Sequence, residues 1–130
     1  MKAGDIFEEQ FTISDEVYGG FIQLFRDQNP LHTNESFATG KGFRGMVMHG
    51  NILNGFISYF VGECLPVKNV IIHSQDIQFK NAAYLNDVLK FNAVVNDVFD
   101  SVNAIEFKYD FKTSESKVIA KGKFQIGLLK

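Results

Sequence analysis

The chain has 130 residues, of which 45% are hydrophobic and 22% charged, and its formal net charge is -2. This length fits one domain, which we expect to cover residues 1–130, and fourteen Phe with no Trp predict a phenylalanine-rich interior. The small negative charge provides no general basic surface, which argues against nucleic acid or an anionic membrane as a partner.

The beginning of the chain does not resemble a targeting segment. Asp5, Glu8 and Glu9 lie where a secretory peptide needs an uncharged apolar run, and no apolar run is long enough for a membrane span. We therefore expect a cytoplasmic protein. The single Cys64 excludes an internal disulfide, and we expect it to be a small buried hydrophobic side chain.

The first quarter of the chain predicts an extended segment followed by helices. Residues up to Ile13 alternate apolar and polar side chains, and Ser14 is a good N-cap for a helix that should end by Gln28, ahead of Pro30. A short capped helical turn is predicted over residues 34–39.

The stretch Met46–Leu65, MVMHGNILNGFISYFVGECL, predicts one buried helix of about four turns that opens at His49-Gly50. A wide apolar face is formed by Ile52, Leu53, Phe56, Ile57, Phe60 and Val61. Gly50, Asn54 and Ser58 form a second, small and polar stripe that needs partners or a ligand if it is enclosed.

The second half of the chain predicts four long strands, over residues 70–80, 88–99, 102–112 and 117–129. An antiparallel sheet with one apolar face needs a cover, and the central helix is the only element apolar enough to provide it. The expected fold class is therefore α+β, with the sheet curled around the central helix.

The run RDQNPLH places Asp27, Asn29 and His32 directly after a helix. A carboxylate and an imidazole five residues apart across a Pro-fixed turn can face one cavity as a proton acceptor and a proton donor, and Asn29 is positioned to bond the carboxylate. Spacing alone favours a different interpretation, a structural turn with an exposed histidine. Both interpretations stay open on this evidence.

His49-Gly50 offers backbone N–H groups at the positive end of the helix dipole, which suits a developing oxyanion. Glycine there also lets a carbonyl oxygen approach, although an ordinary helix start has the same composition. The neighbouring string Gly40–Gly45 matches G-x-G-x-x-G, but no strand precedes it, so a dinucleotide site is rejected. Lys41 and Arg44 in that loop are candidates for ligand phosphates, or simply a solvated basic loop. No metal site is expected, because the three His and Cys64 lack ligand spacing.

Together these motifs resemble the MaoC-like hydratases, the (R)-specific enoyl-CoA hydratases of the hotdog fold. The pattern FxxxxxDxNPLHxxxxxA is followed by Phe43 and His49-Gly50, and the likeness continues through Ser58, Gly62, Leu65-Pro66, Gln75, Phe79-Lys80 and Asp87. The resemblance covers nearly the whole chain. Its fold, a long helix wrapped by an antiparallel sheet, agrees with the layers expected above.

The resemblance implies an enzyme that interconverts trans-2-enoyl and (R)-3-hydroxyacyl thioesters. Asp27 and His32 match the acid-base pair, and the amide of Gly50 matches the group that binds the thioester oxygen. Asn29 and Ser58 match supporting polar positions, and His49 belongs to the same group. The family is commonly a homodimer with sheets joined edge to edge, so a homodimer or a dimer of dimers is expected.

The resemblance implies no cofactor beyond the thioester carrier, either coenzyme A or acyl carrier protein, whose phosphates or acidic surface Lys41 and Arg44 would contact. The sequence departs from the family at Met46, Asn51, Ala82-Ala83 and Asn86, of which Asn51 affects substrate identity most. Two alternatives are a non-catalytic acyl-thioester-binding module and a thioesterase. A thioesterase would need its carboxylate on the central helix, where only Glu63 is available.

Overall fold

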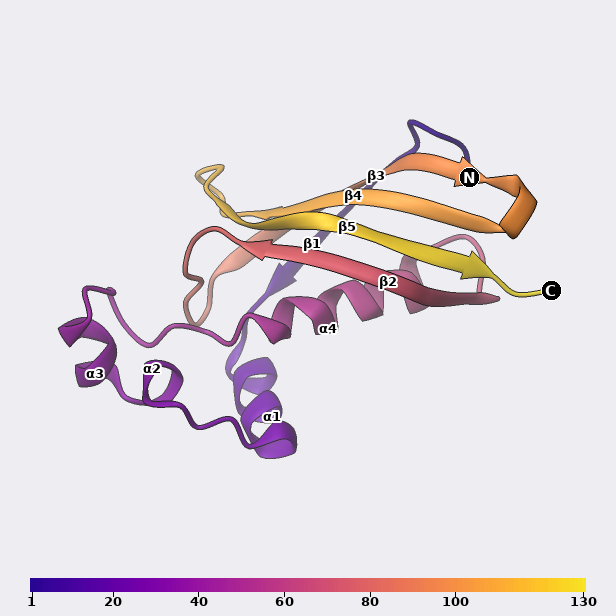
Figure 1. The fold of residues 1–130 in the computed structure, drawn as a ribbon. Helices are drawn as coiled ribbons and strands as arrows, with labels where there is room; N and C mark the ends of the chain where they lie inside the picture. The colour runs from indigo at the N-terminus through magenta and orange to yellow at the C-terminus, as the bar shows by residue number, and fades with distance from the viewer.

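A five-stranded antiparallel sheet covers one long helix in the computed structural model, which describes residues 1–130. The strand order is β1-β3-β4-β5-β2. The strands are β1 (Ile6–Thr12), β2 (Val70–Phe79), β3 (Val88–Phe99), β4 (Ala104–Lys112) and β5 (Val118–Leu128). The helices are α1 (Asp15–Phe25), α2 (Pro30–Thr33), α3 (Glu35–Gly40) and α4 (Asn51–Tyr59), which continues into η1 (Phe60–Cys64). In Figure 1 the sheet lies on one side of α4, while α1, α2 and α3 lie on the other.

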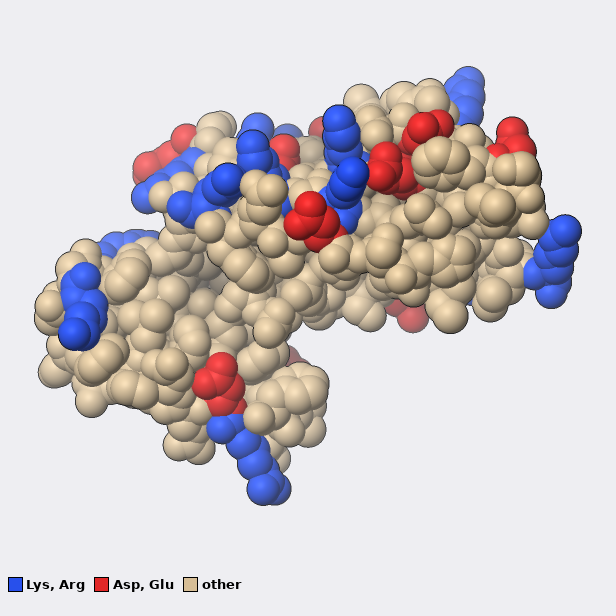
Figure 2. Space-filling view, viewed as in Figure 1, with Lys and Arg blue, Asp and Glu red and all other residues tan.

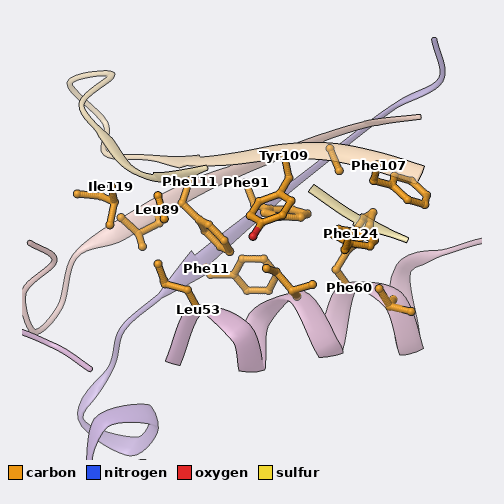
Figure 3. Packing of buried hydrophobic residues seen from close by; sticks show 14 of the residues in the cluster. Phe11, Leu53, Phe60, Leu89, Phe91, Phe107, Tyr109, Phe111, Ile119 and Phe124 are labelled. Carbon is orange, nitrogen blue, oxygen red and sulfur yellow. The ribbon is translucent and has the colours of Figure 1, made fainter. Parts of the chain in front are cut away.

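The core fills the space between α4 and the sheet. Ile52, Leu53 and Ile57 of α4 and Phe60 of η1 are buried, as the apolar spacing predicted. They meet the aromatic side chains of the strands (Figure 3), and Phe60 packs against Phe91 with ring centroids 4.9 Å apart. The predicted α+β arrangement, a sheet covering a central helix, is therefore confirmed.

The charged side chains gather elsewhere. Figure 2 shows Lys, Arg, Asp and Glu mixed over the outer face of the sheet, whereas the side formed by the helices has few of them in this view. The central helix therefore faces the sheet on one side and a weakly charged surface on the other.

The three helices on that side, α1, α2 and α3, each begin after a serine or asparagine residue whose side chain serves as the N-cap. The Ser14 hydroxyl accepts from the amide of Val17, and the Asn29 and Asn34 side chains accept from Leu31 and Phe37. Such caps satisfy amides that would otherwise lack partners. The predicted cap at Ser14 is confirmed, and the Pro30 turn forms a full helical turn, α2, because Asn29 caps it and Pro30 fits its first position.

Two predicted boundaries differ from the structure. The last turn of the central helix is a π-helix, Phe60–Cys64, which a helical apolar pattern does not distinguish from an α-helix. Strand β4 begins at Ala104 rather than at residue 102, because Asp100–Val102 forms a 3-10 turn that Asn103 ends with a φ of 51°. Asn86 likewise has a φ of 70°, a left-handed conformation that asparagine adopts more readily than most residues other than glycine.

Cys64 lies at the end of η1, partly buried. Burial, followed by the neighbouring Glu9, raises the pKa of its thiol to about 11. The thiol is therefore protonated at neutral pH, in agreement with the expected role as a small apolar side chain. A separate finding concerns membranes: none of the helices combines the length and the apolar character needed to cross one.

Candidate active site

His32 is held at its backbone and at its ring. Its Nδ1 lies 2.7 Å from the carbonyl oxygen of Val47, so Nδ1 carries a hydrogen and donates a hydrogen bond to that oxygen. The Tyr18 hydroxyl donates to the carbonyl of His32 at 2.6 Å. Burial raises the pKa of Tyr18, which keeps this hydroxyl a donor. In a neutral ring, Nε2 of His32 is then free to accept a proton.

The Asp27 carboxylate lies next to that free nitrogen, with Oδ2 at 3.9 Å from Nε2 of His32. Its side chain is 50% exposed and that of His32 is 15% exposed. The backbone amide of Asn29 donates to Oδ1 of Asp27 at 3.2 Å. The side chain of Asn29 was predicted to bond the carboxylate, but it accepts from the amide of Leu31 instead, because it caps α2.

His49 is the most buried of the polar side chains at this site, with 3% of its surface exposed. Its Nε2 donates to the backbone carbonyl of Asp27 at 2.8 Å, and its ring stacks on that of His32 with centroids 4.0 Å apart. The other ring nitrogen, Nδ1, has no hydrogen-bond partner. The ring thus holds the backbone of Asp27 in place, and its part in binding substrate stays a prediction.

Gly50 is the N-cap of α4, and its amide makes no hydrogen bond within the chain. A Cβ at this position would lie 2.7 Å from Cε1 of Phe79, so any other residue here would push that ring aside. The free amide at the positive end of the helix is therefore available to an oxygen of a ligand.

These groups line one cavity of about 470 Å³, which contains Asp27, His32, His49, Gly50 and Phe79. Figure 2 shows the surface hollowed between the end of the sheet and the α2–α3 side of the molecule. The cavity brings a carboxylate, an imidazole with a free nitrogen and an unpaired backbone amide together, from segments separated by up to 23 residues. That combination can move a proton next to an oxygen that gains negative charge.

Several predicted site residues lie outside this cavity. Ser58 is exposed two turns further along α4. Arg44 pairs with Asp87 at 3.4 Å and its guanidinium lies over the ring of Tyr84, while the ammonium of Lys41 lies over Phe37. Both cations are thus engaged by the chain itself. Glu63, on which a thioesterase would depend, is exposed at the far end of the helix and pairs with Lys68 at 3.8 Å.

The sequence did not identify Phe79 and Lys80 as site residues, although both line the cavity. Phe79 is the last residue of β2 and Lys80 follows it, and the pairing of β2 with β5 places Phe79 opposite Ala120. The amide of Lys80 donates to the carbonyl of Ile119 at 2.8 Å, which fixes its backbone at the cavity. An exposed lysine there is a better candidate for a carrier phosphate than Lys41 or Arg44, and a periodicity argument offered no signal for it.

Asp27, His32 and His49 also form a group whose potential metal-ligating atoms all lie within 4.8 Å of one another. Spacing in the sequence gave no sign of this group, because its members come from two segments. The two imidazole rings stack at an interplanar angle of 29°, and one nitrogen of each ring is already bonded to a backbone carbonyl.

Comparison with known proteins places most of the chain in one family. Residues 6–118 match the model of the MaoC like domain. An (R)-specific enoyl-CoA hydratase from Rhodospirillum rubrum is 30% identical over 94% of this chain and 84% of that protein. A 3-hydroxybutyryl-CoA dehydratase from Methylorubrum extorquens is 29% identical over 72% of this chain, and the match spans only 59% of that longer protein.

Solved structures agree on the fold. The (R)-hydratase from A. caviae involved in PHA biosynthesis superposes with a TM-score of 0.90 at 22% identity, covering 98% of this chain and 97% of that one. An R-hydratase from Pseudomonas aeruginosa in the unliganded form gives a TM-score of 0.89 at 22% identity, covering 100% of this chain and 83% of that one. At these identities the likeness establishes the shared fold.

Proposed function

The chain belongs to the MaoC-like domain family of hotdog hydratases and dehydratases, and from this premise we propose that it interconverts trans-2-enoyl and (R)-3-hydroxyacyl thioesters. The observation that carries the proposal is the shared cavity, in which Asp27 and His32 face the free amide of Gly50. Relatives named as enoyl-CoA hydratase and hydroxyacyl dehydratases support a carbon-oxygen lyase.

In the proposed hydration, the thioester oxygen accepts a hydrogen bond from the backbone amide of Gly50. One member of the Asp27–His32 pair takes a proton from a water molecule while the water oxygen forms a bond to Cβ. The electron pair of the double bond then moves toward the thioester, and its oxygen gains charge against the amide and the helix dipole. The proton taken from water passes to the other member of the pair, which delivers it to Cα, so the pair ends each turnover in its starting protonation state. Dehydration runs through the same steps in reverse.

A preorganised donor such as the amide of Gly50 contributes about 3 to 4 kcal/mol to stabilising that charge. The proposed chemistry draws only on side chains and backbone of this chain, so we expect turnover of the thioester without an added cofactor. Glycine at position 50 keeps the approach to the amide open.

We extend the proposal to the carrier and to the assembly. Lys80 at the cavity would contact the phosphates of coenzyme A or the acidic surface of acyl carrier protein. Strand β2 is a largely exposed edge of the sheet, and an exposed edge of this length is usually covered. We therefore propose a homodimer, or a dimer of dimers, joined through this edge.

The test is hydration of crotonyl-CoA by the purified protein. Asp27→Asn removes the acceptor and keeps the shape, so we expect kcat to fall by about 10³-fold while thermal unfolding stays unchanged. Asp100→Asn is the matched control, because Asp100 is exposed in the β3–β4 turn, outside the cavity. An Asp27→Asn variant as active as the native protein would refute the assignment. A native protein that binds enoyl thioesters without hydrating them would be the non-catalytic module instead.

A further inference from the structure

A second hollow, of about 800 Å³, lies between α1 and α4. This volume lies within the range of small-molecule sites. Its walls are mostly apolar and come from both helices: Val17, Phe21, Leu24, Phe25, Ile52 and Phe56. Gly20 and Gly55 contribute no side chain, and a Cβ at either would meet nothing within 4 Å. We call this hollow the α1–α4 groove.

The α1–α4 groove shares part of its lining with the catalytic cavity. Phe21, Asp27 and Asn51 line both. A thioester oxygen at the amide of Gly50 lies in the first cavity, and the reacting Cβ must then reach Asp27, at the boundary. For an acyl chain that continues beyond Cβ, the α1–α4 groove is the apolar space next to that boundary.

We propose that the α1–α4 groove binds the acyl chain of the substrate, which makes an unbranched chain of medium length the preferred substrate class. This inference rests on the proposed function. The only charged side chains on the groove, Glu16 and Asp27, are acidic, so its composition suits an uncharged hydrocarbon rather than the anionic carrier. Each methylene buried there should raise kcat/KM by about fourfold.

Two glycines provide a direct test, because the groove exists partly through their missing side chains. Gly20→Leu and Gly55→Leu each place a side chain in the open space of the groove. Leucine also favours a helix over glycine, so both variants should fold. Gly19→Leu is the matched control, since Gly19 is the adjacent residue of α1, exposed and outside the groove.

The experiment compares kcat/KM for crotonyl-CoA and for trans-2-octenoyl-CoA. The native protein and Gly19→Leu should prefer the octenoyl substrate. In Gly20→Leu and Gly55→Leu we expect kcat/KM for octenoyl-CoA to fall at least tenfold, with less than a twofold change for crotonyl-CoA. The preference for the long chain should thus be lost with the catalytic groups untouched.

Two outcomes would overturn the inference. One is an equal change for both substrates. The other is an unchanged ratio of kcat/KM for octenoyl-CoA to kcat/KM for crotonyl-CoA in the groove variants, together with an altered oligomeric state by size-exclusion chromatography. That result would make the groove an interface between copies of the chain. A native protein inactive on both thioesters would contradict the proposed function instead. Calorimetric binding of octanoyl-CoA, which cannot react, would then still test the groove, and equal affinity in the native protein and Gly20→Leu would refute it.

Discussion

The two sides of α4 differ in how they are held. On the sheet side, α4 and η1 pack against a continuous aromatic core in which Phe60, Phe91, Phe107, Phe111 and Phe124 are fully buried. On the other side, α1 and α2 contain no buried residue, and Ala38 is the only one in α3. Stability is therefore concentrated between helix and sheet, whereas Asp27 and His32 lie on the weakly packed side.

Hydrogen bonds rather than apolar burial hold the segment with Asp27 and His32 to the start of α4. Leu31 and His32 exchange bonds with Val47, since the carbonyl of Leu31 accepts from the Val47 amide and the His32 ring donates to the Val47 carbonyl. Tyr18 and His49 bond the carbonyls of His32 and Asp27. This contrast teaches that fold stability and activity should respond to different substitutions.

The largest effect should come from the sheet side. Phe60→Ala removes a ring whose centroid lies within 6.3 Å of the ring centroids of four other residues, Phe7, Phe91, Phe107 and Phe124. We expect the free energy of unfolding to fall by about 3 to 5 kcal/mol, roughly 150-fold to 5,000-fold in the unfolding equilibrium, measured by urea titration. Phe25→Ala, on exposed α1, should cost less than about 1 kcal/mol. Equal losses would mean that the two sides are packed alike.

The next effect separates activity from stability. His32→Asn keeps a side-chain N–H for the carbonyl of Val47 and removes the free Nε2. We expect kcat for crotonyl-CoA hydration to fall by about 10³-fold, with a urea midpoint close to that of the native protein. His73→Gln, at an exposed histidine of β2, is the control and should stay active. A normal kcat in His32→Asn would remove His32 from the mechanism.

The same contrast explains what the sequence could predict. Residues packed on the sheet side must repeat with the period of their element, so the apolar face from Ile52 to Val61 and the four long strands were found from periodicity. The site has no period. Asp27, His32 and Gly50 were found because a local motif carries them, and the structure brings them to one cavity, while their catalytic roles stay predictions.

The missed and misplaced residues depend on tertiary register. Phe79 and Lys80 reach the cavity only because β2 pairs with β5. Ser58 lies on the same face of α4 as Gly50, but a shared helix face does not show whether the cavity extends beyond the first turn of the helix. Lys41 and Arg44 are near the site in sequence, yet Phe37, Tyr84 and Asp87 engage them. Contacts of this kind cannot be predicted from spacing within one segment.

A third prediction concerns how well the sheet side excludes solvent. The pKa of Cys64 is raised from 9.0 to about 11, mainly by burial. At pH 8 the folded protein should therefore hold about 100-fold less thiolate than the unfolded chain, and iodoacetamide should label it correspondingly more slowly. Because the pKa of Cys64 is higher in the folded protein than in the unfolded chain, the protonated thiol contributes to the stability of the fold. This contribution is complete below pH 9 and is lost as the pH rises through 11. Equal labelling rates with and without urea would show that η1 is open.

The smallest effect should come from the connection between the two sides. Tyr18→Phe keeps the ring beside His49 and removes the hydroxyl that bonds the carbonyl of His32. We expect about 1 kcal/mol of stability to be lost and kcat to fall about tenfold, because the imidazole is held less firmly. The KM for crotonyl-CoA should change less than kcat, since Asp27 and His32 both remain.

Tyr59→Phe is the matched control for that variant, because Tyr59 is an exposed tyrosine of α4 that lies outside the cavity. If Tyr18→Phe loses stability without losing kcat, then α2 is positioned by the Val47 bonds alone. If it loses kcat at full stability, the Tyr18 hydroxyl orients His32 without holding the fold. A loss of both, absent from Tyr59→Phe, would place the mechanical link between the stable side and the side with Asp27 and His32 at this one hydroxyl.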